Sequence, residues 1–336
     1  DLIANRALSE SGADRVRALA PTSDRDLIER EHARVAAVRA LRASEGGWGP
    51  AAVPSLGHAL AKLGVAESSW SEVEARDIGV LLASAGSTRK SIRDPRRPAL
   101  AVAVLESLTN VLVSIPALEH AIAKAIGDDG TVKDDASPLL RRIRRELRDA
   151  DQNLVRILER VMASLDARQQ VPDASVTVRN GRYVIPVRRD ARNAVGGIVH
   201  DTSATGATLF VEPPAAIEAA NRIRELEIQS QREVERILRE LTDLGRPFPD
   251  ELAATYESLC EFDSLNARAR FADEFSCAPI RFGVAGDAVT IHSGRHPLLL
   301  AQGGEVVPFD LALTSRERTM LVSGPNTGGK TVLLKA

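Results

Sequence analysis

The sequence predicts a mainly α-helical fold with an inserted small β-rich module and the truncated beginning of a C-terminal α/β domain. Apolar residues recur at helical spacing through most of the chain, whereas one central stretch alternates with the period of a strand. Near the end, an apolar run leads into the glycine-rich loop GPNTGGKT. With 336 residues, 44% apolar and 27% charged, the chain has the length and composition of several globular domains.

Residues 1–136 are predicted to form a helical core. The stretch TSDRDLIEREHARVAAVRAL opens with Thr22, Ser23 and Asp24, which suit a helix N-cap, and continues with helical periodicity. The glycines and proline of SEGGWGP end this helix. Further helices are expected over residues 70–85 and 98–126.

Two long helices are predicted next, one starting in residues 137–172 and one in residues 213–280. Ser137 suits the N-cap of the first, and Pro138 suits its first turn. Each carries a heptad-like apolar seam. The seams consist of Leu140, Ile143, Leu147, Ala150, Leu154, Leu158, Val161 and Leu165, and of Ile223, Leu226, Ser230, Val234, Ile237, Leu241 and Leu244. They predict an antiparallel stalk that ends at Gly245, and a third helix over 250–275 would extend it or fold against it.

The β-rich module is predicted over residues 173–212. SVTVRNGRYVIPV alternates around Asn180-Gly181, a strong two-residue hairpin signal, and GGIVH and ATLFV are expected to be two more strands. Five arginines in this stretch are opposed locally only by Asp190, and we expect them to contact a phosphate backbone. They are Arg179, Arg182, Arg188, Arg189 and Arg192. The alternative is a solvated arginine-rich face.

Other charged and polar groups are given structural interpretations. The net charge of −2 excludes a globally basic nucleic-acid binder, and the Arg141–Arg148 run, which acids interrupt further along the helix, is interpreted as solvated. His200, Asp201 and Ser203 are adjacent, whereas catalytic triads are assembled from separated segments, so a turn ordered by side-chain bonds is expected instead. Tyr183 is assigned to the core. Cys260 and Cys277 are interpreted as buried small hydrophobic residues.

The loop near the end matches the G-x-x-x-x-G-K-[ST] phosphate-binding pattern. A strand over residues 320–322 is expected to lead in, and a helix is expected to start at Val332. The predicted ATP-binding residues are Gly324, Pro325, Asn326, Thr327, Gly328, Gly329, Lys330 and Thr331. Lys330 would reach the β- and γ-phosphates and Thr331 would ligate Mg²⁺. Hydrolysis also requires groups from later strands, so we expect a fragment without ATP turnover.

Several motifs resemble the MutS family of DNA mismatch-repair ATPases. GPNTGGKT is similar to the family's Walker A loop, and GRHP at Gly294–Pro297 to the start of its ATPase domain. NGRYVIPV, GIVHDTSATGATLFVEP and SPLLRRIRREL resemble the second bacterial paralogue, the MutS-two branch. The resemblance covers nearly the whole chain and is weakest before about residue 90. Where relatives read Val-Pro-Asn-Asp, this chain has Phe309 after Val307-Pro308, which could alter adenine contacts.

The resemblance implies a core (1–136), a first lever helix (137–172), a clamp (173–212), second lever helices (213–280) and a truncated ATPase domain (281–336). It implies a homodimeric ATPase that uses ATP and Mg²⁺, binds branched or junction DNA, suppresses homologous recombination and carries a nuclease domain beyond this chain. The alternative partner is the ribosome and its rRNA, with ATP driving the splitting of stalled ribosomes. Mismatch recognition is not expected, and the fragment itself would be a monomer or weak dimer.

No membrane partner is expected. The opening residues DLIANRALSE lack the basic and apolar regions of a signal peptide. No apolar run reaches the roughly 18 residues that a membrane span needs. With two cysteines in no disulfide or metal-binding pattern, a reducing cytoplasm is the predicted location.

Overall fold

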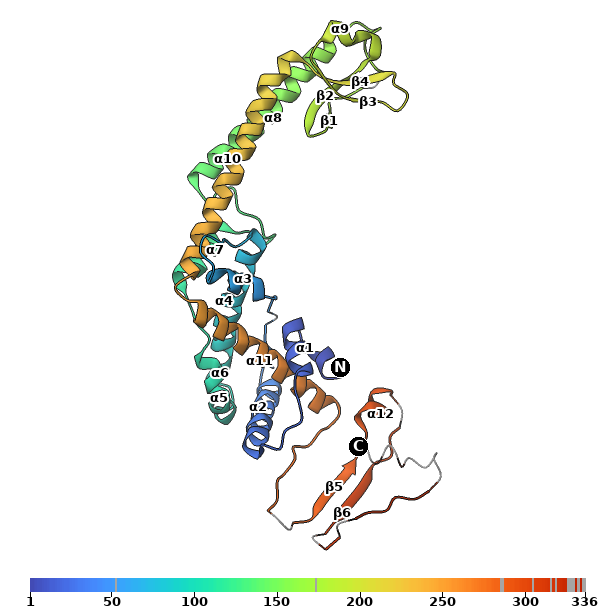
Figure 1. Cartoon of the computed structure of the whole chain (residues 1–336). Helices are drawn as coiled ribbons and strands as arrows, with labels where there is room; N and C mark the ends of the chain where they lie inside the picture. The colour runs from blue at the N-terminus through green and yellow to red at the C-terminus, as the bar shows by residue number, and fades with distance from the viewer. Residues whose placement is uncertain are drawn as a thin grey trace. The chain divides into compact units, whose positions relative to one another are not determined.

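The fold is mainly α-helical with a small β module, as the sequence predicts (Figure 1). The computed structural model describes residues 1–51, 53–172, 174–284, 287–303, 305–314, 316–317, 319–324, 330 and 333. The chain divides into two compact units. Unit 1 is Asp1–Leu60, Val80–Ile115 and Phe248–Ala336, and unit 2 is Ala61–Gly79 and Pro116–Pro247. Among the described residues, no helix is both long and apolar enough to cross a membrane.

Unit 1 is built around the long helix α11 (Pro249–Glu274), which packs against α1 and α2. Leu259, Phe262 and Leu265 of α11 are fully buried. The other elements of this unit are η1 (Ala4–Arg6), α1 (Glu10–Arg17), α2 (Arg25–Ala43), α5 (Ala99–Val104), α6 (Glu106–Asn110), β5 (Val289–Gly294), α12 (Pro297–Ala301) and β6 (Phe309–Leu313). The unit boundaries at 60/61 and 79/80 fall within α3 (Gly57–Leu63) and α4 (Glu72–Ile92).

Side-chain caps fix the starts of α1 and α2. The Asp24 carboxylate accepts a hydrogen bond from the Leu27 amide at 3.1 Å, which confirms the predicted N-cap. Ser9 caps α1, and the buried carboxylate of Asp263 accepts bonds from the amides of Leu8 and Ser9 and from the Ser9 hydroxyl. These bonds satisfy amide groups that a helix start leaves without intrahelical partners.

The C-terminal part of unit 1 contains an antiparallel pair, β5 and β6, with Ile291 opposite Leu311. The Phe309 ring packs over Gly294, where an added Cβ would come within 2.7 Å of it. The predicted strand over residues 320–322 is wrong for this structure, because no strand is assigned there. A strand requires a hydrogen-bonded neighbour, and none of the described strands pairs with this segment, in which Leu321 is 90% exposed.

In unit 2, α8 (Pro138–Ala163) and α10 (Pro214–Gly245) pack side by side, and two contacts show that they run antiparallel. Ser137, the N-cap of α8, hydrogen-bonds Glu233 in the second half of α10 at 2.6 Å. Further along α8, Glu146 pairs with Arg222, nearer the start of α10, at 2.8 Å. Residue numbers therefore rise along one helix as they fall along the other, which confirms the predicted stalk.

The two seams provide most of the buried side chains of this pair. They are Leu140, Ile143, Leu154 and Leu158 of α8, and Ile223, Leu226, Val234, Ile237 and Leu241 of α10. The predicted seam is wrong at Leu244, which is 40% exposed. Gly245 takes the inward position, because its Cα lies so close to Trp70 that a Cβ would stand 2.5 Å from the ring.

The four-stranded module connects α8 to α10, with all neighbouring strands antiparallel and in the order β1-β2-β4-β3. Its strands are β1 (Thr177–Arg179), β2 (Arg182–Arg188), β3 (Ile198–Thr202) and β4 (Thr208–Glu212). The hairpin turn is confirmed: Asn180 and Gly181 both have positive φ, 50° and 73°, as a type I′ turn requires. The short helices η2 (Arg189–Ala191) and α9 (Arg192–Val195) link β2 to β3, and α7 (Pro116–Ala125) precedes α8.

The module gains its stability from the helix pair rather than from its sheet alone. Ile185 and Val187 of β2 lie opposite Val211 and Leu209 of β4, and all four are buried in one cluster with α8 and α10. The helices contribute Leu154, Leu158, Ala216, Ala220 and Ile223. Tyr183 packs against the same cluster, as predicted. A small sheet needs such a hydrophobic partner to be stable in water.

Replacing Glu233 with Gln tests the polar anchor between α8 and α10. The pKa of Glu233 lies below its usual value, chiefly because Arg236 hydrogen-bonds the carboxylate. A depressed folded-state pKa contributes stability above the unfolded-state pKa of about 4.3, and this stability is lost as the pH falls through the folded-state pKa. We expect Glu233→Gln to lower the unfolding free energy by about 1 to 2 kcal/mol at pH 7, and by less below pH ~4.

Urea unfolding at both pH values measures this difference. The control is Glu240→Gln, because Glu240 also pairs with Arg236 but its side chain is 62% exposed, against 5% for Glu233. A solvated pair contributes about 0 to 1 kcal/mol. A loss for Glu233→Gln that is the same at pH 7 and below pH ~4 would contradict the assignment.

Candidate nucleic-acid interface and phosphate loop

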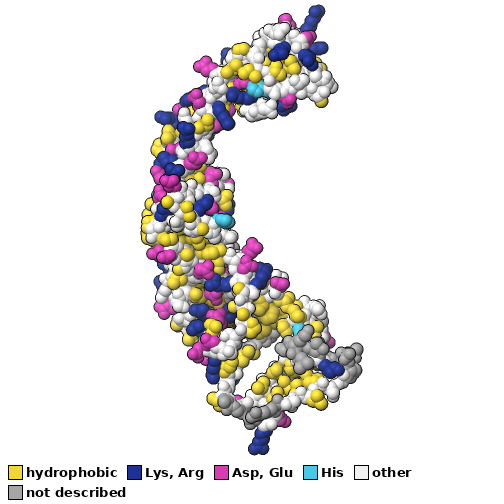
Figure 2. All heavy atoms as spheres, in the orientation of Figure 1, with side chains coloured by type: hydrophobic (Ala, Val, Ile, Leu, Met, Phe, Trp, Pro, Cys, Tyr) yellow, Lys and Arg dark blue, Asp and Glu magenta, His cyan; other side chains and the backbone are white. Residues whose placement is uncertain are grey.

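Three of the five predicted module arginines lie together and are exposed. Arg188 ends β2, Arg189 begins η2 and Arg192 begins α9. Ala191, between Arg189 and Arg192, is 1% exposed and belongs to the hydrophobic cluster. It anchors the turn in the core, while the three arginine side chains are exposed to solvent. Figure 2 shows Lys and Arg side chains projecting from the module.

These three guanidinium groups are weakly paired or unpaired. Arg188 Nε stands 4.0 Å from Asp190 Oδ1, and both side chains are mostly exposed. Among the described residues, no carboxylate lies within ion-pair distance of Arg189 or Arg192. Backbone hydrogen bonds hold the first two of these residues, since the Arg188 amide donates to the Gln169 carbonyl and the Arg189 amide donates to the Ala207 carbonyl. The site therefore presents positive charge on a fixed turn.

The other two predicted arginines are held within the module. Arg179 lies over the ring of Phe210, 4.5 Å from its centroid, and pairs with Asp201 at 3.4 Å. Arg182 reaches Glu212 at 3.3 Å and Asn221 at 3.2 Å. The expectation that only Asp190 opposes the arginines is thus wrong, because the folded module brings Asp201 of β3 and Glu212 of β4 to them.

Glu212 is the polar centre of the module. Its side chain is 2% exposed and accepts from Arg182, while its second oxygen lies 2.7 Å from His200 Nε2. The register shift between Val199 and Asp201 places His200 at a bulge. Gly197 allows the close approach of β3, because its φ is +91° and a Cβ would fall 2.1 Å from the Glu212 carbonyl oxygen. The free-energy cost of burying this carboxyl group is offset by its hydrogen bonds to Arg182 and His200.

Sequence reasoning missed Glu212 and Phe210 as partners of the arginines, and it missed His200 as the second partner of Glu212. The available signal was a glutamate at the end of an apolar strand, FVE, directly before Pro213-Pro214. A carboxylate at such a position needs a buried cation or hydrogen-bond donor. Which donor supplies it depends on strand pairing, and the sequence pattern does not give the order β1-β2-β4-β3.

His200, Asp201 and Ser203 do not form a triad. His200 bonds Glu212, Asp201 pairs with Arg179, and the Ser203 hydroxyl accepts from the Thr208 amide at 3.1 Å. Asp201 also accepts from the Thr202 amide at 2.8 Å. The interpretation as a turn ordered by side-chain bonds is confirmed.

Four of the five arginines in the basic run of α8 form ion pairs. Asp134 holds both Arg144 and Arg148, at 2.7 and 2.9 Å, and these bonds lower the pKa of Asp134 below its usual value. Arg142 pairs with Glu146 at 3.7 Å on the same helix. These contacts are consistent with a solvated structural face.

Most of the phosphate-loop residues lie outside the described residues, namely Pro325, Asn326, Thr327, Gly328, Gly329 and the predicted magnesium ligand Thr331. Gly324 has a φ of +145°, a backbone conformation that favours glycine. Lys330 has helical conformation, and its Nζ donates to the Gly324 carbonyl at 2.5 Å. The ammonium group is therefore folded back onto the backbone of Gly324.

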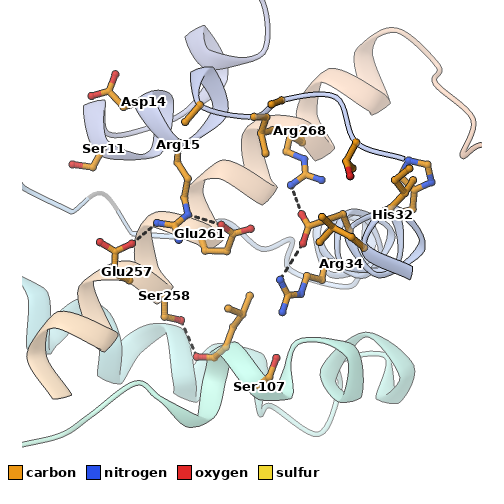
Figure 3. Close-up of a pocket in the computed structure, with 18 of the residues that line it drawn as sticks. Ser11, Asp14, Arg15, His32, Arg34, Ser107, Glu257, Ser258, Glu261 and Arg268 are labelled. Carbon is orange, nitrogen blue, oxygen red and sulfur yellow. Dashed lines mark hydrogen bonds and ion pairs between the residues drawn. The ribbon is translucent and has the colours of Figure 1, made fainter. Parts of the chain in front are cut away.

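A pocket of about 1270 Å³ lies in unit 1 between α1, α2, α6 and α11 (Figure 3). Its arginines are already paired: Arg15 bonds Glu257 and Glu261, whereas Arg34 and Arg268 both bond Glu31. Burial raises the pKa of Glu31, but the two arginines outweigh it and hold that pKa below its usual value. The pocket offers a ligand few free charges.

The two cysteines differ. Burial raises the pKa of the Cys260 thiol to about 11, so this residue behaves as a small hydrophobic side chain. Cys277 is exposed, and the expectation that it is buried is wrong. It follows the end of α11, where the chain leaves the helix core. No group of three or more potential metal ligands occurs within the part of the chain that the structure describes.

Together, these features define a protein in which an antiparallel helix pair carries a basic β module and a phosphate-loop sequence follows. Endonuclease MutS2 of Gemmatimonas aurantiaca is 58% identical over 334 residues, which cover 99% of this chain and 41% of that relative. Endonuclease MutS2 of Geobacillus thermodenitrificans is 36% identical (99% and 42% covered), and that of Thermomicrobium roseum is 37% identical (100% and 43% covered).

The chain belongs to the MutS2 family. It spans about two fifths of the length of the curated relatives it matches. No protein-family model matches the chain.

Replacing Glu212 with Ala tests the centre of the module. Removing the carboxyl group leaves Arg182 and His200 without their shared partner and opens a buried space. We expect the unfolding free energy to fall by about 2 to 3 kcal/mol. Amide hydrogen exchange should speed up in β1–β4 and not in α11. The control is Glu218→Ala, an exposed glutamate on α10, for which the change should stay within about 0.5 kcal/mol. If amide hydrogen exchange in β1–β4 is unchanged in Glu212→Ala, Glu212 does not stabilise the module.

Proposed function

We propose that this chain is the stalk, clamp and nucleotide-loop part of an ATPase that binds branched DNA and suppresses homologous recombination. The observation that carries the proposal is the exposed trio Arg188, Arg189 and Arg192, on a turn that the buried Ala191 anchors at the end of the α8–α10 pair. Exposed guanidinium groups bind phosphate oxygens through paired N–H donors, and each contact releases counterions.

Recognition at this site would read the nucleic-acid backbone and its shape. Arg179 already lies over the ring of Phe210, and Tyr183 packs against the core cluster, so both aromatic rings of the module are engaged within it. Stacking aromatics are what single-strand binders use to hold bases. Phosphate contacts alone give affinity without sequence specificity. A four-way junction presents several backbones at once, which fits such a module.

ATP and Mg²⁺ are the proposed cofactors of the loop from Gly324 to Thr331. Lys330 would exchange its bond with the Gly324 carbonyl for bonds to the β- and γ-phosphates. Thr331 would ligate the Mg²⁺. Nucleotide binding would then shift the position of the α8–α10 lever and open or close the clamp, in a homodimer that contains the remaining ATPase strands and a nuclease domain.

An arginine variant of the module tests the proposal. In the 336-residue chain, the triple change Arg188→Ala, Arg189→Ala and Arg192→Ala should weaken binding to a four-way DNA junction. Each lost phosphate contact should lower the slope of log Kobs against log salt by about 0.9, so we expect the slope to fall by about 2 to 3. Fluorescence anisotropy across a salt series measures both quantities.

The matched control removes three exposed cations from the lever, with Arg141→Ala, Arg142→Ala and Arg224→Ala, and should leave junction binding nearly unchanged. Linear duplex DNA and purified ribosomes are titrated in parallel. If the module variant loses ribosome binding but keeps junction binding, the module serves ribosome rescue instead of junction binding. Equal behaviour of the module variant and the wild-type chain on every partner would refute the clamp assignment.

Nucleotide binding is tested separately with a fluorescent ATP analogue. We expect weak, Mg²⁺-dependent binding by the chain and no hydrolysis. Lys330→Ala should weaken binding about ten- to hundred-fold, because a hydrogen bond to a charged group contributes about 1.5 to 3 kcal/mol. Lys124→Ala, an exposed lysine on α7, is the control. Measurable Mg²⁺-dependent ATP turnover by the chain would contradict the expectation.

A further inference from the structure

A second concentration of positive charge lies at the C-terminal end of α4 in unit 1. The stretch TRKSIRDPRR, residues 88–97, contains five basic residues and one acidic residue in a chain whose net charge is −2. Four of the basic residues line a hollow of about 690 Å³: Arg89, Lys90, Arg93 and Arg96. These four residues are called the basic hollow below. Gly86 lies in its wall and leaves the helix surface open, because no atom of the described residues lies within 4 Å of where a Cβ would be.

The basic hollow retains unpaired charge. Among the described residues, no carboxylate lies within ion-pair distance of Arg89, Lys90 or Arg93. Arg89 donates one N–H to the Leu112 carbonyl at 3.1 Å, and Arg93 donates one to the Asn110 side chain at 2.8 Å. A guanidinium carries five N–H donors, so these bonds orient both arginines and leave further donors for a ligand.

Arg96 is positioned by the turn that follows α4. The Asp94 carboxylate accepts from the Arg96 amide, from Nε at 3.0 Å and from Nη2 at 2.7 Å. Pro95 restricts the backbone between the two residues. The Arg96 side chain is nonetheless 73% exposed, and Nη1 is not used by Asp94. The turn therefore holds a guanidinium at the rim without covering it.

Helix electrostatics accounts for only part of this pattern. Cations in the last turn of a helix oppose the negative end of the macrodipole, and Arg89 and Lys90 occupy that turn of α4. Arg93 directly follows the last residue of α4 and its amide still bonds the Arg89 carbonyl, whereas Arg96 lies in the turn beyond, where the dipole effect falls off. The charge there exceeds what the end of α4 requires.

We propose that the basic hollow binds the phosphodiester backbone of a nucleic acid, as a contact separate from the module arginines. The proposal rests on the nucleic-acid binding proposed above. Arg89 and Arg93 are one turn apart, about 6 Å along the helix axis, and a nucleic-acid strand carries one charge per about 3.4 Å of duplex axis. The hollow thus reaches more than one phosphate. The described residues that line it include no aromatic side chain, so the contact reads the backbone and not the bases.

The test uses the 336-residue chain with Lys90→Ala, Arg93→Ala and Arg96→Ala. Arg89 is kept, because its bond to the Leu112 carbonyl supports the fold. Binding to duplex DNA, duplex RNA and a four-way junction should weaken about ten-fold, with the salt slope lower by about 2 to 3. The matched control removes three exposed cations from α1 and α2, with Arg17→Ala, Arg25→Ala and Arg30→Ala, and should bind as the wild-type chain does.

A footprint reports on the site directly. Bound nucleic acid should slow acetylation of Lys90 and leave the exposed Lys124 of α7 unaffected. Protection of Lys90 by inorganic phosphate or ATP but not by an oligonucleotide would overturn the proposal in favour of a small-anion site, and protection only by acidic polypeptide would overturn it in favour of a protein contact.

Comparison with the module variant separates the two proposals. If the hollow variant binds normally while the Arg188, Arg189 and Arg192 variant does not, the basic hollow is refuted and the clamp stands. If both variants bind normally, both proposals fail. Weakened binding by each variant, with Lys90 protected, supports two independent backbone contacts.

Discussion

The antiparallel packing of α8 on α10 is the constraint on which the rest of unit 2 depends. The module strands bury only one small set of residues, and Leu154 and Leu158 of α8 with Ala220 and Ile223 of α10 complete that cluster. At the other end of the pair, Ser137 caps α8 and bonds Glu233. Since apolar seams alone tolerate slippage, this buried polar contact specifies the register of the helices. The register of the α8–α10 pair therefore determines which helix side chains pack against the module.

Arginine serves two different purposes in the module, and burial separates them. Arg179 and Arg182 are used internally, by an aromatic ring and by a carboxyl group that is almost fully buried. Arg188, Arg189 and Arg192 flank or share a turn whose only buried member is Ala191. The first pair stabilises the sheet, and the trio remains available to a polyanion. The same logic applies in unit 1, where the arginines of the large pocket are paired and those of the basic hollow are mostly free.

Local sequence signals predicted the elements that depend on local chemistry. The N-caps at Asp24 and Ser137 and the Asn180-Gly181 turn form as expected, because each is decided by a few neighbouring residues. The long apolar seams predicted the helix pair, because a pattern that repeats over many residues still identifies the buried face when single positions depart from it. The strand expected at residues 320–322 did not form, because a strand is defined by a partner and not by its own composition. Leu244 is exposed because Gly245 is the residue that fits against Trp70.

By itself, the sequence determined the mainly α-helical class, the long helices, the inserted hairpin and, through its motifs, the family. These follow from spacing, capping and turn chemistry, which act over a few residues. Only the tertiary structure decided which cations are free. The folded sheet brings Asp201 to Arg179 and Glu212 to Arg182, whereas the described residues offer Arg89 and Arg93 neutral acceptors and no carboxylate. Charge neutralisation depends on distances between residues far apart in sequence, and those distances exist only once the chain is folded.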